Sequence, residues 1–135
     1  MRALKTFIVE DSPIILDNLV ATLEEMAPVQ VVGSAADEST AMSMLAQMRN
    51  EVDLVIIDVF LKSGSGLGVL RGVAQSGFKA KRVVLTNYAT VDMREKCKAL
   101  GADCVFDKSN DLDDLLSYCL RLAEGHGDTG SGVFS

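Results

Sequence analysis

The sequence predicts a single α/β domain, in which helices cover both faces of a doubly wound, five-stranded parallel sheet. The chain has 135 residues, of which 48% are hydrophobic, and this suits one domain with one core. Five short apolar or β-branched runs alternate with longer segments whose apolar residues recur at helical spacing. Such alternation implies right-handed crossovers, which place all the strands parallel in one sheet.

Each strand is predicted from a short run of apolar or β-branched residues. Runs of this kind fit strands that helices bury on both faces. In chain order, the expected strands are 6–10 (TFIVE), 29–33 (VQVVG), 53–58 (DLVIID), 82–86 (RVVLT) and 103–106 (DCVF).

The segments between the strands are predicted to be amphipathic helices. Apolar residues recur three or four positions apart from Ile15 to Met26, and again from Leu112 to Leu122. Polar residues that can cap a helix mark three helix beginnings: Asp11 or Ser12 before Pro13, Asp37 with Thr40, and Asn110 with Asp113.

The domain is expected to span residues 1–124, and residues 125–135 are expected to form a flexible, glycine-rich tail that contains His126, the only histidine. No apolar stretch is long enough for a membrane span or a signal peptide, so we expect a cytoplasmic protein with no membrane partner. The three cysteines show no CxxC spacing, which indicates neither a disulfide framework nor a zinc site. A net charge of −6 argues against direct binding of nucleic acid.

Polar residues follow four of the five predicted strands or end them. Glu10 and Asp11 follow the first strand, Asp58 ends the third, Thr86 ends the fourth, and Lys108 follows the fifth by two residues. Parallel strands end at one edge of the sheet, so these side chains are expected to meet there. If the strand order is 2-1-3-4-5, the carboxylates flank the crevice between the first and third strands, where ligands bind in folds of this kind.

This group of side chains suits phosphoryl transfer. Three close carboxylates repel one another unless a cation neutralises them, and Mg²⁺ suits so small a set of oxygen ligands. Lys108 and the Thr86 hydroxyl can bind phosphoryl oxygens, and Asp58 is the candidate nucleophile, because its carboxylate can form an acyl phosphate.

These residues resemble the receiver domain of bacterial two-component response regulators, a flavodoxin-like (βα)5 fold of the CheY-like superfamily. The resemblance covers residues 5 to about 124. The motifs that carry it are IVEDSP after the first strand, Gly66 eight residues beyond Asp58, VVLTNYA at the fourth strand, and GADCVFDKS around the fifth.

The resemblance implies a phosphoacceptor with no separate substrate turnover, which dephosphorylates itself slowly. Asp58 would take its phosphoryl group from a phosphohistidine on a sensor histidine kinase or a histidine phosphotransfer protein, and Thr86 and Lys108 would contact the phosphoryl oxygens. A downstream protein partner would bind the face formed by the fourth helix, fifth strand and fifth helix, and the protein would be a monomer or weak homodimer. The implied ligands of Mg²⁺, or of Mn²⁺ in its place, are Glu10, Asp11, Asp58 and the backbone carbonyl of Phe60.

The chain departs from the family pattern near the switch region. Val105, three residues before Lys108, stands where the family usually has an aromatic residue that moves together with Thr86. Phe106 is aromatic, but alternation along the strand should point it to the other face of the sheet. Asn87 replaces the usual small residue after Thr86. The phosphorylation chemistry is therefore expected to carry over better than the output mechanism.

Two aromatic residues and one amide are expected to control access to the phosphoryl group. Phe60 lies two residues after Asp58, and Tyr88 lies two residues after Thr86. We expect both rings to flank the acyl phosphate, with Asn87 beside them. The hypothesis is that the rings keep water away and lengthen the lifetime of the phosphorylated form; the alternative is that they only cover the loop.

Three other functions are alternatives to a phosphoacceptor. A phosphohydrolase with an aspartate nucleophile usually has a DxD pair after its first strand, whereas Asp58 belongs to the third. A flavin-binding module needs a phosphate loop where this chain has the acidic EDSPIIL. A pseudo-receiver would keep the fold and bind partners without phosphorylation. Since no helix-turn-helix follows the last helix, a stand-alone receiver is expected.

Overall fold

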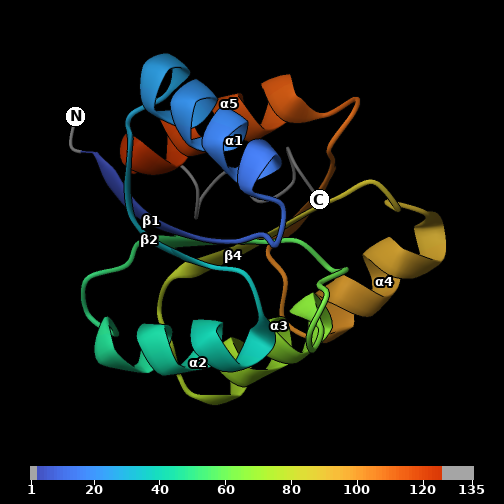
Figure 1. Ribbon diagram of the computed structural model, residues 1–135. Helices are drawn as coiled ribbons and strands as arrows, with labels where there is room; N and C mark the ends of the chain where they lie inside the picture. The colour runs from blue at the N-terminus through green and yellow to red at the C-terminus, as the bar shows by residue number, and fades with distance from the viewer. Residues whose placement is uncertain (1–2, 126–135) are drawn as a thin grey trace.

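The computed structural model describes residues 3–125, which form a helix–sheet–helix arrangement (Figure 1). Strands and helices alternate in the order β1 (Leu4–Val9), α1 (Pro13–Met26), β2 (Val29–Ala35), α2 (Glu38–Gln47), β3 (Leu54–Ile57), α3 (Gly66–Gln75), β4 (Lys81–Thr86), α4 (Val91–Ala99), β5 (Cys104–Asp107) and α5 (Leu112–Ala123). Apart from Gly125, the predicted tail with His126 lies outside the described residues.

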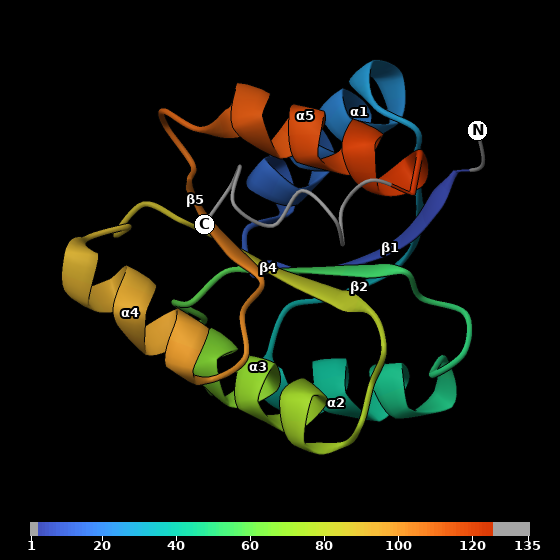
Figure 2. The same ribbon diagram turned by 180° about the vertical axis from the view of Figure 1, so that it is seen from behind.

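All five strands are parallel and lie in the order β2-β1-β3-β4-β5, which confirms the predicted fold class and strand order. The helices α1 and α5 cover one face, and α2, α3 and α4 cover the other (Figures 1 and 2). The strand ends differ by one or two residues from the expected ones. In particular, β3 ends at Ile57, so Asp58 is the first residue after the strand rather than its last.

The core consists of two apolar layers, one on each face of the sheet, because neighbouring strand residues point to opposite faces. In β1, Phe7 and Val9 pack beneath α2, α3 and α4, whereas Leu4 and Ile8 pack beneath α1 and α5. Phe106 lies on the α1/α5 side, with its ring centroid 6.0 Å from that of Tyr118. The predicted orientation of Phe106 is confirmed.

Two of the three predicted helix beginnings are confirmed. The Ser12 hydroxyl accepts the N–H of Ile15, and the Asp37 carboxylate accepts the N–H of Thr40 at 2.8 Å. The prediction for the last helix is wrong, because Asn110 lies in a turn and α5 follows Asp111. Asp111 does not cap α5 with its side chain, since that carboxylate accepts the N–H of Asp107 instead.

All three cysteines are free and buried, as small apolar residues would be. Burial raises the pKa of the Cys119 thiol to about 12, and burial, with the nearby charge of Asp103, raises that of Cys104 to about 11. These thiols are therefore neutral at physiological pH and serve as packing groups. Within residues 3–125, no helix is both long and apolar enough to span a membrane.

Candidate functional site

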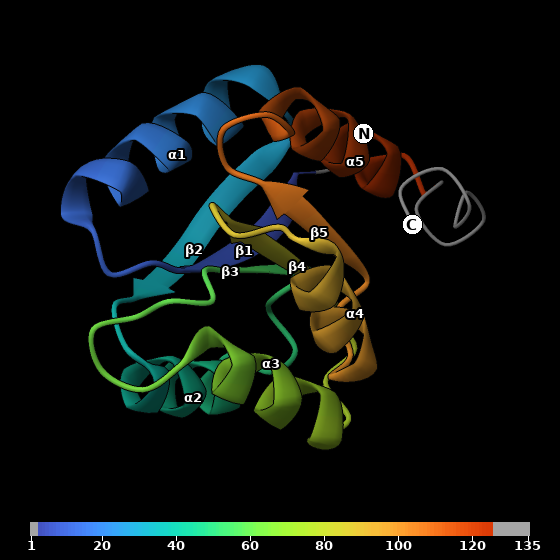
Figure 3. The ribbon, with the colours of Figure 1, turned by 90° about the vertical axis from the view of Figure 1, so that its right-hand side faces the viewer.

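The predicted functional residues meet at the edge of the sheet where the strands end. Figure 3 faces this edge, and the loops after β1, β3 and β4 lie around it. Backbone hydrogen bonds continue past the regular strands: the N–H of Asp58 donates to the Val9 carbonyl at 2.9 Å, and that of Lys108 donates to the Thr86 carbonyl at 3.0 Å. The loops that carry these residues therefore begin from a fixed framework.

Three carboxylates form the centre of the site. Oxygen atoms of Glu10, Asp11 and Asp58 all lie within 4.8 Å of one another. Each carboxylate also accepts a backbone N–H, which fixes its orientation. The donors are Ser12 to Glu10 at 3.0 Å, Lys62 to Asp11 at 2.7 Å, and Phe60 to Asp58 at 3.3 Å.

The Lys108 ammonium bridges two of these acids. Its Nζ lies 2.6 Å from Glu10 Oε1 and 2.8 Å from Asp58 Oδ2. Burial lowers the pKa of Lys108, but the hydrogen bonds and charges of Asp58 and Glu10 outweigh burial and hold that pKa above its usual value. The lysine is therefore charged at neutral pH.

The donor set fits a divalent cation. Three carboxylates and one ammonium leave a formal charge of minus two within the cluster. The converging ligands are all oxygen atoms, which suits a hard ion such as Mg²⁺. Glu10 is only 3% exposed, and a carboxylate that is so buried needs a compensating positive charge.

The last residue of β4 and the residues that follow it complete the rim of the site. Thr86 is fully buried, and its Oγ1 accepts the N–H of Tyr88 at 3.2 Å. Asn87 is exposed, and together with Lys108 it lines a cavity of about 300 Å³ between α1 and the loops after β4 and β5. From the sequence, Thr86, Asn87 and Lys108 could be expected near Asp58 only because the strand order was predicted.

Two aromatic rings meet beside the carboxylates. The rings of Phe60 and Tyr88 pack edge to face, with centroids 4.8 Å apart and an interplanar angle of 69°. They come from the loops after β3 and β4, and they remain 53% and 60% exposed, respectively. The two residues that were expected on either side of a phosphoryl group therefore contact each other.

The residue at the predicted switch position is aliphatic and lies inside the core. Val105 is 3% exposed and packs in the layer beneath α2, α3 and α4. Its carbonyl accepts a hydrogen bond from Arg94 Nη1 at 2.7 Å. The same guanidinium bonds the Ala89 carbonyl and the Asp111 carboxylate, so Arg94 links α4 to the segments before and after it.

The sequence patterns did not predict a role for Glu38 or Arg94 near the site. The Glu38 carboxylate accepts the N–H of Ser65 at 2.8 Å and so holds the loop after β3. A signal for Glu38 exists in the alternating glycines of GSGLG, whose missing side chains leave room for a neighbour. Arg94 has no such signal, because its main partners are backbone carbonyls that any residue could supply.

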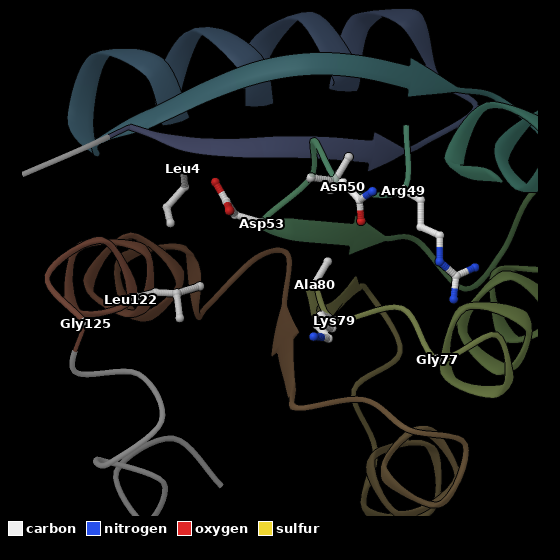
Figure 4. A pocket seen from close by; sticks show the side chains of 10 residues that line it. Leu4, Arg49, Asn50, Asp53, Gly77, Lys79, Ala80, Leu122 and Gly125 are labelled. Carbon is white, nitrogen blue, oxygen red and sulfur yellow. The ribbon is translucent and has the colours of Figure 1, made fainter. Parts of the chain in front are cut away.

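The larger cavity, of about 590 Å³, lies at the opposite edge of the sheet (Figure 4). Leu4 at the start of β1, Asp53 just before β3 and Leu122 near the end of α5 line it, together with Arg49 and Lys79. This cavity is therefore separate from the carboxylate cluster.

Comparison with known proteins gives one consistent result. A family model described as the response regulator receiver domain matches residues 6–119. The chain is 30% identical to the nitrate/nitrite response regulator protein NarP of Escherichia coli, over 97% of this chain and 58% of NarP. It is 26% identical to the uncharacterized transcriptional regulatory protein YvfU of Bacillus subtilis, over 90% of this chain and 60% of YvfU.

Solved structures share the fold. The signal receiver domain of the putative response regulator NarL from Mycobacterium tuberculosis matches with a TM-score of 0.81 at 18% identity, over 93% of this chain and 99% of that one. A structure described as two RcsB dimers bound to two parallel DNAs matches with a TM-score of 0.80 at 20% identity, over 92% of this chain and 62% of that one.

The predicted exclusion of nucleic acid as a partner is wrong. YvfU is a transcriptional regulatory protein, and the RcsB structure contains DNA. The chain spans 43 to 60% of the length of the curated relatives it matches. The net charge of −6 counts only these 135 residues, so it carries no information about the rest of a longer regulator. The partners were predicted for a stand-alone receiver, whereas these relatives are longer proteins.

Proposed function

The chain belongs to the response regulator receiver domain family, and we propose that it is a phosphoacceptor whose Asp58 takes a phosphoryl group from a phosphohistidine in a Mg²⁺-dependent reaction. The observation that carries this proposal is the convergence of three carboxylates within 4.8 Å, with Lys108 Nζ 2.8 Å from Asp58. Phosphoryl transfer needs chiefly positioning and charge neutralisation, and these groups supply both.

Each residue has a proposed role in the transfer. A carboxylate oxygen of Asp58 forms a bond to phosphorus while the bond from phosphorus to the histidine nitrogen breaks. Lys108 moves its ammonium from the Asp58 carboxylate to a phosphoryl oxygen, and the buried Thr86 hydroxyl donates to another. The ligands that would hold Mg²⁺, or Mn²⁺ in its place, are Glu10, Asp11, Asp58 and the Phe60 carbonyl. The metal would offset the charge that the phosphoryl group brings.

The proposed output is the regulation of transcription by a longer protein that contains this domain. The support is the similarity to regulators such as NarP and YvfU, of which the chain covers about 60%. Phosphorylation would shift a population between two arrangements of the loops around Asp58, and a DNA-binding partner segment would respond to that shift.

The wild-type chain is expected to incorporate a phosphoryl group from a small phosphodonor such as acetyl phosphate when Mg²⁺ is present. The label should be released by acid and by base, as from an acyl phosphate, and a chelator should abolish the incorporation. Labelled phosphodonor and intact-mass measurement check both points. If no label enters at saturating Mg²⁺, a pseudo-receiver is the better description. Sustained hydrolysis of a phosphoester would instead indicate a phosphohydrolase.

Replacing Phe60 and Tyr88 together by serine is expected to shorten the half-life of the phosphorylated chain severalfold. The packed rings would exclude water from the side of the phosphoryl group, and their removal opens a path for in-line attack. The decay of labelled protein in Mg²⁺ measures the effect. The control is Met26→Ser, which removes an exposed apolar side chain at the end of α1. An unchanged half-life in the double variant would mean that the rings merely cover the loop.

A further inference from the structure

The loop between β3 and α3, residues 58–65, carries much of the candidate metal site. It begins with Asp58, it contains the Phe60 carbonyl, and its Lys62 N–H donates to the Asp11 carboxylate at 2.7 Å. Phe60 and Ser65 form an isolated antiparallel bridge across the loop. A shift of this loop would therefore move two ligands and the donor that orients a third.

Glu38 contacts this loop at two points. It is the first residue of α2, and its backbone N–H donates to the Ser63 carbonyl at 3.3 Å. Its side-chain Oε1 accepts the N–H of Ser65 at 2.8 Å. Backbone and side chain of one residue thus hold both sides of Gly64, whose φ of 75° allows the chain to turn between them.

Two glycines leave room for the Glu38 side chain. A Cβ at Gly64 or at Gly68 would overlap atoms of Glu38. Gly68 lies in the first turn of α3, so the carboxylate sits at the positive end of that helix as well as on Ser65.

We propose that Glu38 is a positioning residue for the metal site, which holds the β3–α3 loop so that the Phe60 carbonyl and the Lys62 N–H stay where Mg²⁺ binding needs them. The proposal rests on the proposed function, because it takes the acidic cluster as the Mg²⁺ site. Glu38 hydrogen-bonds Ser63 and Ser65, neither of which is a proposed metal ligand, so it acts through the backbone of the loop.

Glu38→Ala is expected to weaken Mg²⁺ binding roughly tenfold, in the range typical of residues that support metal ligands without binding the metal. Glu38→Gln keeps an oxygen that accepts the Ser65 N–H, so its dissociation constant should stay within about twofold of wild type. Calorimetric titration with Mg²⁺ measures both. Hydrogen exchange at the Ser65 and Lys62 amides should accelerate in Glu38→Ala and stay slow in Glu38→Gln.

A matched control exists in α1. The Glu24 carboxylate accepts the backbone N–H of Val31 at 2.9 Å, which is the same type of bond at the opposite edge of the sheet. Glu24→Ala should leave Mg²⁺ affinity unchanged. Equal losses of affinity in Glu24→Ala and Glu38→Ala would mean that lost stability, and not loop position, weakens the site.

Gly68→Ala offers an independent route to the same effect. Its new methyl group would overlap the Glu38 carboxylate and displace it from Ser65, so this variant should also weaken Mg²⁺ binding. With Glu38→Ala already present, adding Gly68→Ala should cause no further loss. Additive losses in the double variant would overturn the proposal, as would wild-type Mg²⁺ affinity in Glu38→Ala.

Phosphorylation at saturating Mg²⁺ separates the two proposals. If Glu38 acts only by positioning the metal site, Glu38→Ala should incorporate label from acetyl phosphate once Mg²⁺ is raised in proportion to its weaker affinity. If the wild-type chain binds Mg²⁺ but takes no label, the proposed phosphoacceptor function is wrong. The Mg²⁺ titrations of the Glu38 variants still test the positioning role of Glu38. If the wild-type chain binds no Mg²⁺, both proposals fail.

Discussion

Replacing Asp58 by asparagine is expected to abolish phosphoryl incorporation from acetyl phosphate completely. The amide that replaces the carboxylate has no anionic oxygen to attack phosphorus, so no acyl phosphate can form. Glu10 and Asp11 stay in the cluster, but Glu10 is 3% exposed and its Oε1 already binds Lys108 at 2.6 Å. Glu10 is therefore not expected to replace Asp58 as the acceptor.

The fold should survive this change. Asparagine has nearly the same shape as aspartate, and its Oδ1 can still accept the N–H of Phe60. A control of the same chemistry is Asp103→Asn, at the opposite edge of the sheet, where the carboxylate accepts the N–H of Arg82 at 2.8 Å. Asp103→Asn should take up label at the wild-type rate, and circular dichroism should match wild type in both variants. Label that persists in Asp58→Asn would place the phosphoacceptor elsewhere.

The fold was predictable because each strand contains a short run of apolar or β-branched residues. In β3, all four residues from Leu54 to Ile57 are buried, which a run without polar interruption indicates directly. The orientation of Phe106 followed from alternation along β5 in the same way. Helix capping was less predictable, because Asp111 could either cap α5 or accept the Asp107 N–H, and residue type does not distinguish these partners.

The position of the candidate site was also predictable, since parallel strands end at one edge and the polar residues follow them. The supporting contacts were not. The bond between Glu38 and Ser65 joins residues 27 positions apart, and its acceptor is a glutamate at an ordinary helix start. The contact between the Phe60 and Tyr88 rings depends on the paths of two loops. Local sequence patterns carry information about periodicity and strand ends, whereas the path of a loop depends on the packing around it.

The charge argument failed for a different reason. A net charge of −6 is a sum over the whole chain, and the largely buried acidic cluster contributes part of it. The curated relatives compared above are longer than this chain, which spans 43 to 60% of their length, so its net charge describes only part of a protein of that size. The net charge of this domain is therefore a poor guide to the partners of a longer protein that contains it.

Gly66→Ala is expected to lower the free energy of unfolding by about 3–5 kcal/mol, which is a large part of the stability of a typical domain. Gly66 is the first residue of α3, and it is buried against the segment that leaves β3. A Cβ at this position would overlap the backbone carbonyl of Asp58 and the Cα of Val59. Backbone atoms cannot rotate away as the end of a side chain can, so the helix would have to move from the strand end.

That movement would also break the hydrogen bond from the Gly66 N–H to the Val59 carbonyl, which is 2.9 Å long. Urea unfolding followed by circular dichroism measures the loss. Gly72→Ala in the same helix is the matched control, because its Cβ would meet only the end of the Met42 side chain. There, alanine should change stability by about 1 kcal/mol or less, since its better helix propensity offsets the contact. Equal midpoints for Gly66→Ala and wild type would show that α3 can shift freely. In that case Asp58 would not be held by close packing of α3 against the end of β3.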